Sequence, residues 1–513
     1  MTEILTSYLE DRWQRGAGDG TKLYDPTTEA VVATASTDGL DLAAAFRHAR
    51  AVGGAALRAL TFAERGALLK AMSKAIHARR EELIEIGRQN GGNTRGDAKF
   101  DIDGATGTLM YYAGLGQELG ARTVLLDGEA ITIGASSRLS GQHILTPRPG
   151  VAVHVNAFNF PAWGLAEKAA CAILAGVPVI SKPGTATAML TWAMVKAVVE
   201  AEVLPPGVLS LVVGSARDLL DHPQWGDVVA FTGSADTGEQ IRQRVLATGV
   251  PVNVEADSLN ATVLAPGAEE ATYDAFIRDV AREMTQKAGQ KCTATRRIFV
   301  PEDQLDEVIE DLGERLGRTR VGDPASDEVT MGPLSSRGQL DAARKGITTL
   351  LAECDVAWGE VERGALPGVE DGKGFFVTPL LLKARPGAEA VHRLEVFGPV
   401  STVIAYDGSA AAAADGVRRG EGSLVCSVYG DDRDFLGEII PALAGWHGRI
   451  VVTDAKIADK AFAPGMVMPH LLHGGPGRAG GGEELGGLRG MRLYQQRTAV
   501  QGNGPLLARL LER

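Results

Sequence analysis

Residues 150–245 alternate between short strand-like runs and helix-like runs, and this alternation constrains the fold more than any other feature. The strand-like runs are GVAVHV, PVIS, GVLSLVV and DVVAFT, and each ends in a turn rich in small or polar residues. The runs between them, EKAACAILAGV, TATAMLTWAMVKAVVEAEV and EQIRQRV, have helical spacing. Such an alternation predicts an α/β fold with a parallel sheet, helices on its faces, and ligands at the carboxyl ends of the strands.

The composition excludes several classes of protein. The chain has 513 residues, 45% hydrophobic and 23% charged, which is enough for two or three domains with large cores. Its net charge of −12 argues against general nucleic-acid binding. Four scattered cysteines and nine histidines predict neither a disulfide framework nor a metal site. With no signal-peptide pattern and no apolar run near the roughly 18 residues of a membrane span, we expect a cytoplasmic protein without a membrane partner.

Two segments outside residues 150–245 have structural patterns of their own. Residues 41–118 are rich in helical packing segments, and Thr61 with Glu64 matches the capping box that begins a helix. Residues 130–147 alternate around two glycines like a two-stranded ribbon. Such a ribbon either pairs internally or reaches another subunit.

Cys292 lies in the stretch QKAGQKCTATRRIFV, between a predicted helix and a predicted strand. The preceding run AFIRDVAREMTQKAGQ has the spacing of an amphipathic helix that Gly289 can end, and Ile298–Val300 has strand composition. A cysteine in such a connection, near basic residues and free backbone amides, is suited to act as a thiolate nucleophile. The alternative is a buried structural cysteine, which is our interpretation of Cys171.

Two polar residues are candidates for catalysis beside that cysteine. Glu255 interrupts an apolar strand in VNVEADSLNATV, so its carboxylate is either paired structurally or held ready for proton transfer. Asn159, in NAFNFPAWG, either satisfies the backbone of its loop or donates to a developing oxyanion. The sequence pattern alone leaves both alternatives open.

Two strand ends carry residues suited to a dinucleotide. In FTGSADTG, Gly233 allows close approach, Ser234 offers a hydroxyl, and the following helix N-terminus favours phosphate. In SKPGTAT, the ammonium of Lys182 can reach a ribose hydroxyl or a phosphate. A simple connecting turn and a surface lysine are the structural alternatives.

Taken in chain order, these stretches resemble the aldehyde dehydrogenase superfamily over nearly the whole sequence. The motifs that carry the resemblance are NAFNFPAWG, SKPGTAT, LPPGVLSLVVG, FTGSADTG, VEADSLN, GQKCTATRR, VGDPASDEVTMGPL, LEVFGPV and GGPGRAGGGEELGG. The resemblance implies a modified Rossmann cofactor domain, an α/β catalytic domain and a small oligomerisation β-ribbon. The corresponding residues are 1–129 and 148–256 for the cofactor domain, 257–470 for the catalytic domain, and 130–147 with 471–513 for the ribbon and tail.

The resemblance also assigns catalytic roles. It implies that the Cys292 thiolate attacks an aldehyde carbon, and that the oxyanion is held by the Asn159 amide and the Cys292 backbone N–H. Hydride then passes to the nicotinamide and leaves a thioester. Glu255 corresponds to the base that activates water for hydrolysis of this thioester.

The same resemblance assigns contacts to the cofactor. Glu395 and Phe397 of LEVFGPV correspond to residues that hold the nicotinamide ribose and position the ring. Lys182 and Ser234 correspond to contacts with ribose and pyrophosphate. Many NAD-using relatives have a glutamate three residues beyond the lysine of SKPGTAT, whereas this chain has Thr185, which removes repulsion of a 2′-phosphate. We therefore expect NADP, with NAD as the weaker alternative.

Details of the motifs narrow the branch of the superfamily. The common Gly-Gly-Lys after the base is replaced by Asp257, Ser258 and Leu259, and the C-terminal motif region is similar to the branch that oxidises CoA-thioester semialdehydes in aromatic-ring degradation. The expected reaction is the oxidation of 3,4-dehydroadipyl-CoA semialdehyde to the acid in benzoate degradation. One alternative is the oxepin-CoA-derived semialdehyde of phenylacetate degradation, where the dehydrogenase is fused to a hydratase domain. Because only NGPLLARLLER follows the motif region in this sequence, we expect the stand-alone enzyme instead. The other alternative is a CoA-acylating dehydrogenase. The superfamily also implies a homodimer or a dimer of dimers.

Overall fold

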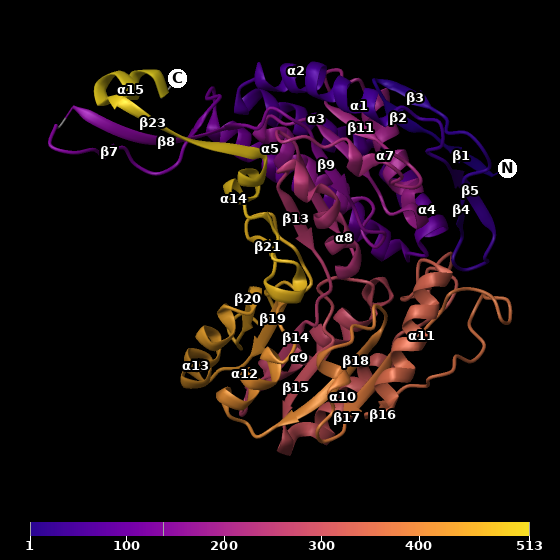
Figure 1. The fold of residues 1–513 in the computed structure, drawn as a ribbon. Helices are drawn as coiled ribbons and strands as arrows, with labels where there is room; N and C mark the ends of the chain where they lie inside the picture. Colours follow the sequence, from indigo (N-terminus) through magenta and orange to yellow (C-terminus); the bar gives the residue numbers. More distant parts are fainter. Residues whose placement is uncertain (1, 137, 512–513) are drawn as a thin grey trace.

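The computed structural model describes residues 2–136 and 138–511. They form two lobes, each built on a mostly parallel sheet flanked by helices, and a ribbon of strands projects from one side (Figure 1). The α/β fold predicted from the sequence is confirmed. Within the described residues, no helix is both long and apolar enough to cross a membrane.

The first lobe contains a sheet with the strand order β13-β12-β9-β10-β11-β2-β3. Successive residues of its strands enter different cores, since Val179 and Ile180 of β10 pack on opposite faces. The parallel strands are β9 (Ala152–Val155), β10 (Val179–Lys182), β11 (Leu209–Leu211), β12 (Val228–Thr232) and β13 (Val252–Glu255), and the antiparallel ones are β2 (Ser7–Leu9) and β3 (Arg12–Gln14).

Helices cover both faces of this sheet. The larger core lies under α3 (Phe62–Ala78), α4 (Arg80–Gly91), α5 (Arg95–Leu119), α6 (Trp163–Ala175) and α7 (Ala188–Glu200), and the opposite core lies under α1 (Leu42–His48) and α8 (Ala235–Val245). The short helix α2 (Gly54–Arg58) and a small sheet of β1 (Glu3–Leu5), β5 (Val31–Ala35) and β4 (Thr21–Tyr24) complete the lobe.

The second lobe contains a sheet with the strand order β16-β17-β18-β15-β14-β19-β20, in which β16 alone is antiparallel to its neighbour among these described strands. The strands are β14 (Ala261–Leu264), β15 (Arg297–Pro301), β16 (Cys354–Trp358), β17 (Leu380–Ala384), β18 (Val400–Tyr406), β19 (Ser423–Tyr429) and β20 (His447–Thr453). The flanking helices are α9 (Glu270–Thr285), α10 (Leu305–Gly317), α11 (Arg337–Leu351), α12 (Ala410–Arg418) and α13 (Arg433–Ala444).

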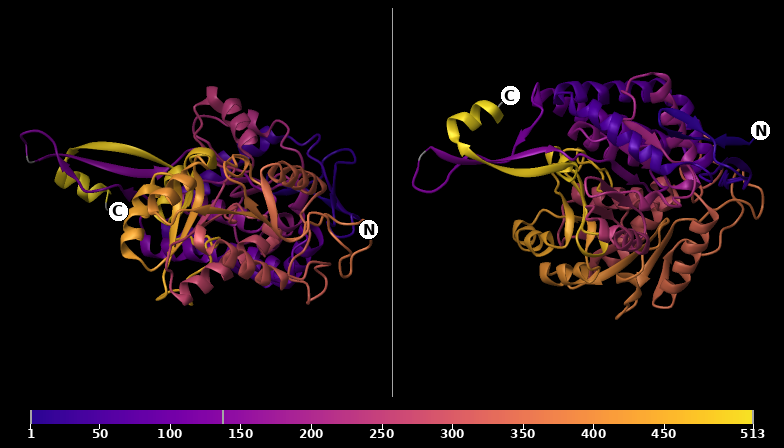
Figure 2. Two further views of the ribbon diagram at one scale, coloured as in Figure 1. Left: turned by 90° about the horizontal axis from the view of Figure 1, so that it is seen from below. Right: turned by 45° about the horizontal axis from the view of Figure 1, so that its top comes forward.

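The projecting ribbon joins segments far apart in the sequence. Strand β8 (Leu139–Pro147) pairs along its full length with β23 (Gln495–Asn503), and β6 (Leu125–Leu126) and β7 (Ile131–Thr132) also pair with β8. Figure 2 shows the ribbon and the terminal helix α15 (Gly504–Leu511) extending away from both lobes. The alternation predicted for residues 130–147 therefore corresponds to β7 and β8 within the described residues, with β23 as the main partner of β8, and residue 137 lies outside the described residues.

Residues 472–494 do not follow the ribbon, although the predicted tail began at residue 471. Strands β21 (Leu472–Gly474) and β22 (Glu483–Leu485) form a hairpin beside β13, where the N–H of Gly482 donates to the carbonyl of Val254 at 3.0 Å. Helix α14 (Leu488–Met491) then packs on the first lobe. Apolar side chains of this segment, such as Leu485, are buried in the core of the first lobe. The predicted domain boundaries stay predictions.

Candidate active site

Cys292 lies where the chain passes from α9 to β15, as the sequence predicts. Helix α9 ends at Thr285, and residues 287–289 have positive φ angles of 55°, 52° and 68°, which turn the chain toward the first lobe. The Asn260 side chain donates to the carbonyl of Cys292 at 2.7 Å and to that of Ala294 at 3.0 Å. These bonds fix the loop, and they leave Cys292 partly exposed while Cys171 is buried.

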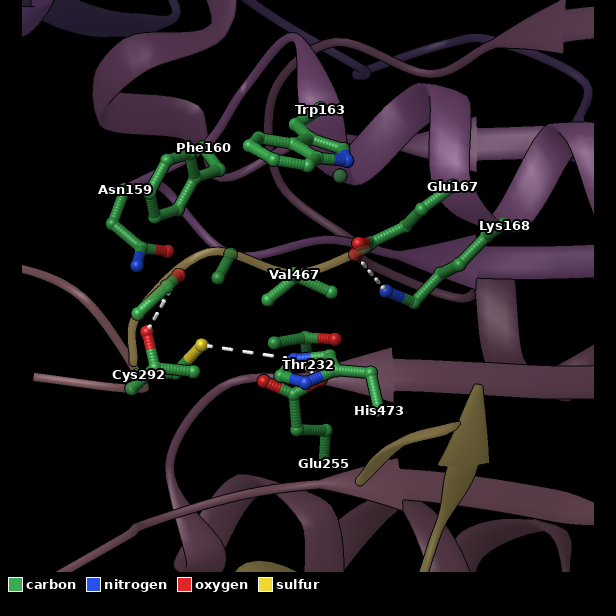
Figure 3. A pocket seen from close by; sticks show the side chains of 14 residues that line it. Asn159, Phe160, Trp163, Glu167, Lys168, Thr232, Glu255, Cys292, Val467 and His473 are labelled. Atoms are coloured by element: carbon green, nitrogen blue, oxygen red, sulfur yellow. Dashed lines mark hydrogen bonds and ion pairs between the residues drawn. The ribbon is translucent and has the colours of Figure 1, made fainter. Parts of the chain in front are cut away.

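The ionisable side chains of His473 and Glu255 lie close to the sulfur of Cys292 (Figure 3). The Nε2 atom of His473 lies 3.9 Å from Cys292 Sγ and 3.1 Å from Glu255 Oε2. A carboxylate oxygen of Glu255, Nε2 and Sγ all lie within 4.8 Å of one another. Glu255 is the last residue of β13 and His473 lies in β21, so three separate segments supply this cluster.

Burial and mutual charge determine the protonation of this cluster. Burial, reinforced by the adjacent Glu255 carboxylate, raises the pKa of the Cys292 thiol well above its ordinary value. Burial also opposes ionisation of Glu255, but the neighbouring His473 outweighs it and lowers the pKa of Glu255 to about 2. Conversely, Glu255 raises the pKa of His473 despite the burial of the imidazole. The Glu255 carboxylate is therefore ionised beside a neutral Cys292 thiol, and the imidazole of His473 lies between them.

Asn159 lies on the same side of the pocket as Cys292 (Figure 3). Its side-chain amide donates to the carbonyl of Gln290 at 2.9 Å, and the side chain is buried. Because a carboxamide has two N–H groups, one remains for another acceptor in the pocket. The structure thus brings together Cys292, Glu255 and Asn159, the predicted catalytic residues.

A cavity of about 590 Å³ runs from this cluster along the carboxyl ends of the first-lobe strands. Its lining includes most of the predicted cofactor residues: Thr185, Gly233, Ser234, Glu395 and Phe397, together with Glu255 and Cys292. Ser234 caps the N-terminus of α8, a position that favours a phosphate. The size and residues of this cavity fit a dinucleotide.

Lys182 lies behind the wall of this cavity and is not among its lining residues. Its ammonium donates to the carbonyl of Pro183 at 3.0 Å and to the hydroxyl of Thr185 at 3.3 Å, and Thr185 donates in turn to the carbonyl of Gly214 at 2.9 Å. Burial lowers the pKa of Lys182 to about 8. The lysine and threonine thus form a connected pair beside the cavity.

Glu395 and Phe397 also line this cavity. Glu395 accepts hydrogen bonds from the Ser258 backbone at 3.1 Å and from Arg296 Nε at 3.3 Å. Burial raises the pKa of Glu395, which Arg296 opposes. The ring of Phe397 lies 5.4 Å from the Arg296 guanidinium and contacts Phe158 edge-on.

A second, small pocket also contacts Cys292, and Figure 3 shows the side chains that line it. Lys168 lines this pocket and bridges the carboxylates of Glu167 at 3.1 Å and Glu484 at 3.0 Å. Beyond Trp163 and Val467, which line both spaces, an outer cavity of about 510 Å³ opens to solvent. The sulfur of Cys292 therefore lies between a dinucleotide-sized cavity and a separate route from the surface.

The sequence did not identify His473. The available signal was its position directly before the Gly-Gly of GGPGRAGGGEELGG, in a segment already matched to a motif. Asn260, the last residue of VEADSLN, was also missed, although a polar residue within an apolar run is a general sign of a buried hydrogen bond.

Comparisons with known proteins identify relatives of this chain. Residues 13–499 match the model of the aldehyde dehydrogenase family. The 3,4-dehydroadipyl-CoA semialdehyde dehydrogenase of Aromatoleum evansii is 46% identical over 92% of this chain and 93% of the relative. The alpha-ketoglutaric semialdehyde dehydrogenase of Bacillus subtilis is 31% identical over 69% of this chain and 70% of the relative.

Solved structures show the same fold. A 3,6-anhydro-L-galactose dehydrogenase in complex with NADP has a TM-score of 0.84 at 21% identity, covering 98% of this chain and 100% of that one. Betaine aldehyde dehydrogenase of Staphylococcus aureus in complex with NAD+ also has a TM-score of 0.84 at 21% identity, covering 97% of this chain and 95% of that one. The family model and the sequence relatives show that this chain belongs to the aldehyde dehydrogenase family, aldehyde-oxidising oxidoreductases that use NAD or NADP.

Proposed function

We propose that this chain oxidises the aldehyde group of a CoA-thioester semialdehyde, with 3,4-dehydroadipyl-CoA semialdehyde as the preferred substrate and NADP as the hydride acceptor. The main observation that supports this reaction is the position of Cys292. Its sulfur lies beside Glu255, between the dinucleotide-sized cavity and the small pocket lined by Lys168. Cys292, Glu255 and Asn159 line both of these spaces. The 46% identity with the Aromatoleum evansii enzyme supports the substrate.

In the proposed reaction, the Cys292 sulfur attacks the aldehyde carbon and the carbonyl oxygen becomes an oxyanion. The free N–H of the Asn159 side chain and the backbone N–H of Cys292 donate to that oxygen. A bound NADP supplies the nicotinamide that accepts the hydride. Glu255 then takes a proton from the water that hydrolyses the thioester on Cys292.

A CoA-acylating dehydrogenase would instead transfer the acyl group from Cys292 to free CoA. The carboxylate of Glu255 within 4.8 Å of the sulfur favours hydrolysis, since it can hold one water molecule beside the acyl carbon. The two reactions differ in their products. Formation of the free acid in the absence of CoA supports hydrolysis, and formation of no acid without CoA contradicts it.

The preference for NADP rests on Thr185 and Lys182. Neither residue adds negative charge beside the cavity, and the positive charge of the Lys182 ammonium, which donates to the Thr185 hydroxyl, attracts a 2′-phosphate. A carboxylate at residue 185 would repel that phosphate. We therefore expect a higher kcat/KM with NADP than with NAD.

We propose that the CoA portion of the substrate binds in the outer cavity. This cavity is lined partly by apolar groups, including Phe100 and Met466, and it also has the exposed cations Lys99 and Arg282. An acyl-CoA needs such a combination, because its long arm is only weakly polar whereas its nucleotide end carries several phosphate charges. Replacing both cations with glutamine should raise KM for the CoA thioester and leave KM for a short free aldehyde unchanged.

We further propose a homodimer, or a dimer of such dimers, that forms through the ribbon. The projecting elements carry exposed apolar side chains, including Ile131, Leu506 and Leu510, which a second subunit can cover. Light scattering on the purified protein tests this proposal. A monomer at micromolar concentration would contradict it.

The substrate proposal is tested by steady-state rates for a panel of CoA-linked and free aldehydes, each measured with NADP and with NAD. We expect the CoA semialdehyde with NADP to have the highest kcat/KM and the Cys292→Ala variant to form no reduced cofactor. If short free aldehydes exceed every CoA thioester, the proposed substrate is wrong. If no aldehyde yields reduced cofactor, the proposed function is wrong.

A further inference from the structure

His473 is the one member of the active-site cluster that the proposed reaction does not use. Its imidazole is buried, and the same atom, Nε2, faces the sulfur of Cys292 at 3.9 Å and the carboxylate of Glu255 at 3.1 Å. The backbone behind it is tightly held, because a Cβ on Gly474 would lie 2.0 Å from the carbonyl oxygen of Gly482. The imidazole is therefore fixed between the nucleophile and the carboxylate.

The nucleophile needs a proton acceptor. Only the thiolate of Cys292 attacks a carbonyl carbon efficiently, and this thiol does not ionise readily by itself, since burial and the adjacent carboxylate raise its pKa well above the ordinary value. Two neighbouring groups can accept its proton, His473 and Glu255. Their basicities differ strongly: the pKa of Glu255 is lowered to about 2, whereas that of His473 is raised above its ordinary 6.5. The imidazole is thus the stronger base.

We propose that His473 is a catalytic residue that accepts the proton of Cys292 and that Glu255 stabilises the imidazolium formed. The Sγ–H bond breaks, an Nε2–H bond forms, and the new N–H points to the carboxylate already 3.1 Å away. The total charge of the three groups does not change, because the proton only moves from sulfur to nitrogen. This inference rests on the proposed function, since it assigns the first step of the same reaction.

Charged groups from several elements surround the imidazole and bear on its protonation. After Glu255, Glu167 also favours the imidazolium, whereas Arg449 opposes it. The ammonium of Lys168 is largely compensated by its two carboxylate partners. The groups around the cluster are Glu255 from β13, Glu167 and Lys168 from α6, Glu395 before β18, Arg449 from β20 and Glu484 from β22. Carboxylates are the majority in this set, so the imidazolium formed by proton transfer is stabilised.

The test measures the reactivity of the sulfur without turnover. Purified full-length protein is treated with iodoacetamide between pH 5 and pH 10, with neither cofactor nor aldehyde present, and the labelling of Cys292 is followed by peptide mass spectrometry. Wild-type protein and the variants His473→Gln and Glu255→Gln are compared, because glutamine keeps a polar side chain of similar size but has no basic site. We expect His473→Gln to react about tenfold more slowly at pH 7 and its pH profile to move up by about one pH unit. Glu255→Gln should keep rapid labelling.

Two results would overturn the assignment. The first is that the labelling of Cys292 in His473→Gln has the same pH profile as in the wild-type protein. The second is that Glu255→Gln loses as much labelling as His473→Gln, which would make the carboxylate the proton acceptor. A second variant, His473→Ala, separates a lost base from a disturbed fold: added imidazole should restore its labelling, and failure to do so contradicts the proposal. If wild-type Cys292 is labelled as expected but no aldehyde reduces NADP, the proposed function fails and the role of His473 stands.

Discussion

Replacing Glu255 with glutamine should give a protein that is acylated once and then stalls. The carboxylate lies within 4.8 Å of Cys292 Sγ, a separation that leaves room for one hydrogen-bonded water next to an acyl group on the sulfur. Glutamine keeps the size of the side chain and an oxygen for His473, but it cannot accept a proton from that water. A general base contributes about 10²–10⁴-fold, so hydrolysis of the thioester should slow by this factor, equivalent to about 3–5 kcal/mol on its barrier.

Rapid mixing of Glu255→Gln with NADP and the CoA semialdehyde measures this effect. We expect a burst of reduced cofactor close to one equivalent per subunit, followed by slow turnover, and an intact mass increased by the acyl group. The Cys292→Ala variant, as the control, should show neither the burst nor the added mass. Wild-type steady-state turnover in Glu255→Gln, or the absence of an adduct on Cys292, would refute the assignment of Glu255 as the base.

Three further predictions concern other parts of the site. Lys291→Met leaves the buried carboxylate of Glu283 without the ammonium 2.7 Å away, so the urea midpoint should fall by the equivalent of about 3–5 kcal/mol, and adding Glu283→Gln should restore most of it. Thr185→Glu should lower kcat/KM for NADP by about 10–100-fold and change that for NAD much less, because a carboxylate near a phosphate costs about 1–3 kcal/mol in this partly solvated cavity. His473→Gln should lower the thermal unfolding temperature more at pH 5.5 than at pH 9. The pKa of Glu255 is lowered in the folded protein, so its contribution to stability is present above about pH 4.5. The pKa of His473 is raised, so its contribution is complete below about pH 6.5 and is lost at higher pH. Both contributions are therefore present at pH 5.5, whereas that of His473 is lost at pH 9.

The features of the fold that the sequence predicts correctly depend on residues close together in the chain. The capping box at the start of α3 is an example: Thr61 Oγ1 accepts from the backbone N–H of Glu64 at 3.2 Å, and the Glu64 carboxylate accepts from the N–H of Thr61 at 2.7 Å. The strand predicted at Ile298–Val300 is likewise the centre of β15. In both cases the signal and the structure it specifies lie within a few residues, so periodicity and capping rules suffice.

Contacts across long sequence separations were not accessible in this way. The contact between His473 and Cys292 spans 181 residues, and no local pattern gives the path of the segment that carries the histidine. The position of Lys182 shows the same limit, because a lysine after a strand can point into the ligand cavity or, as here, along its own turn toward Pro183. Such a choice is decided by packing of the completed fold, which composition and periodicity do not contain.

The active site is formed by three chain segments that are far apart in the sequence. Glu255 ends a strand of the first lobe, Cys292 precedes a strand of the second, and His473 comes from the hairpin that returns between them. The hairpin is attached to the first lobe through the backbone bond from Gly482 to Val254 at 3.0 Å, one residue before Glu255. The hairpin also packs against β19 and β20 of the second lobe. His473 is therefore held by both lobes, so its distances to Glu255 and to Cys292 both depend on how the two lobes pack together.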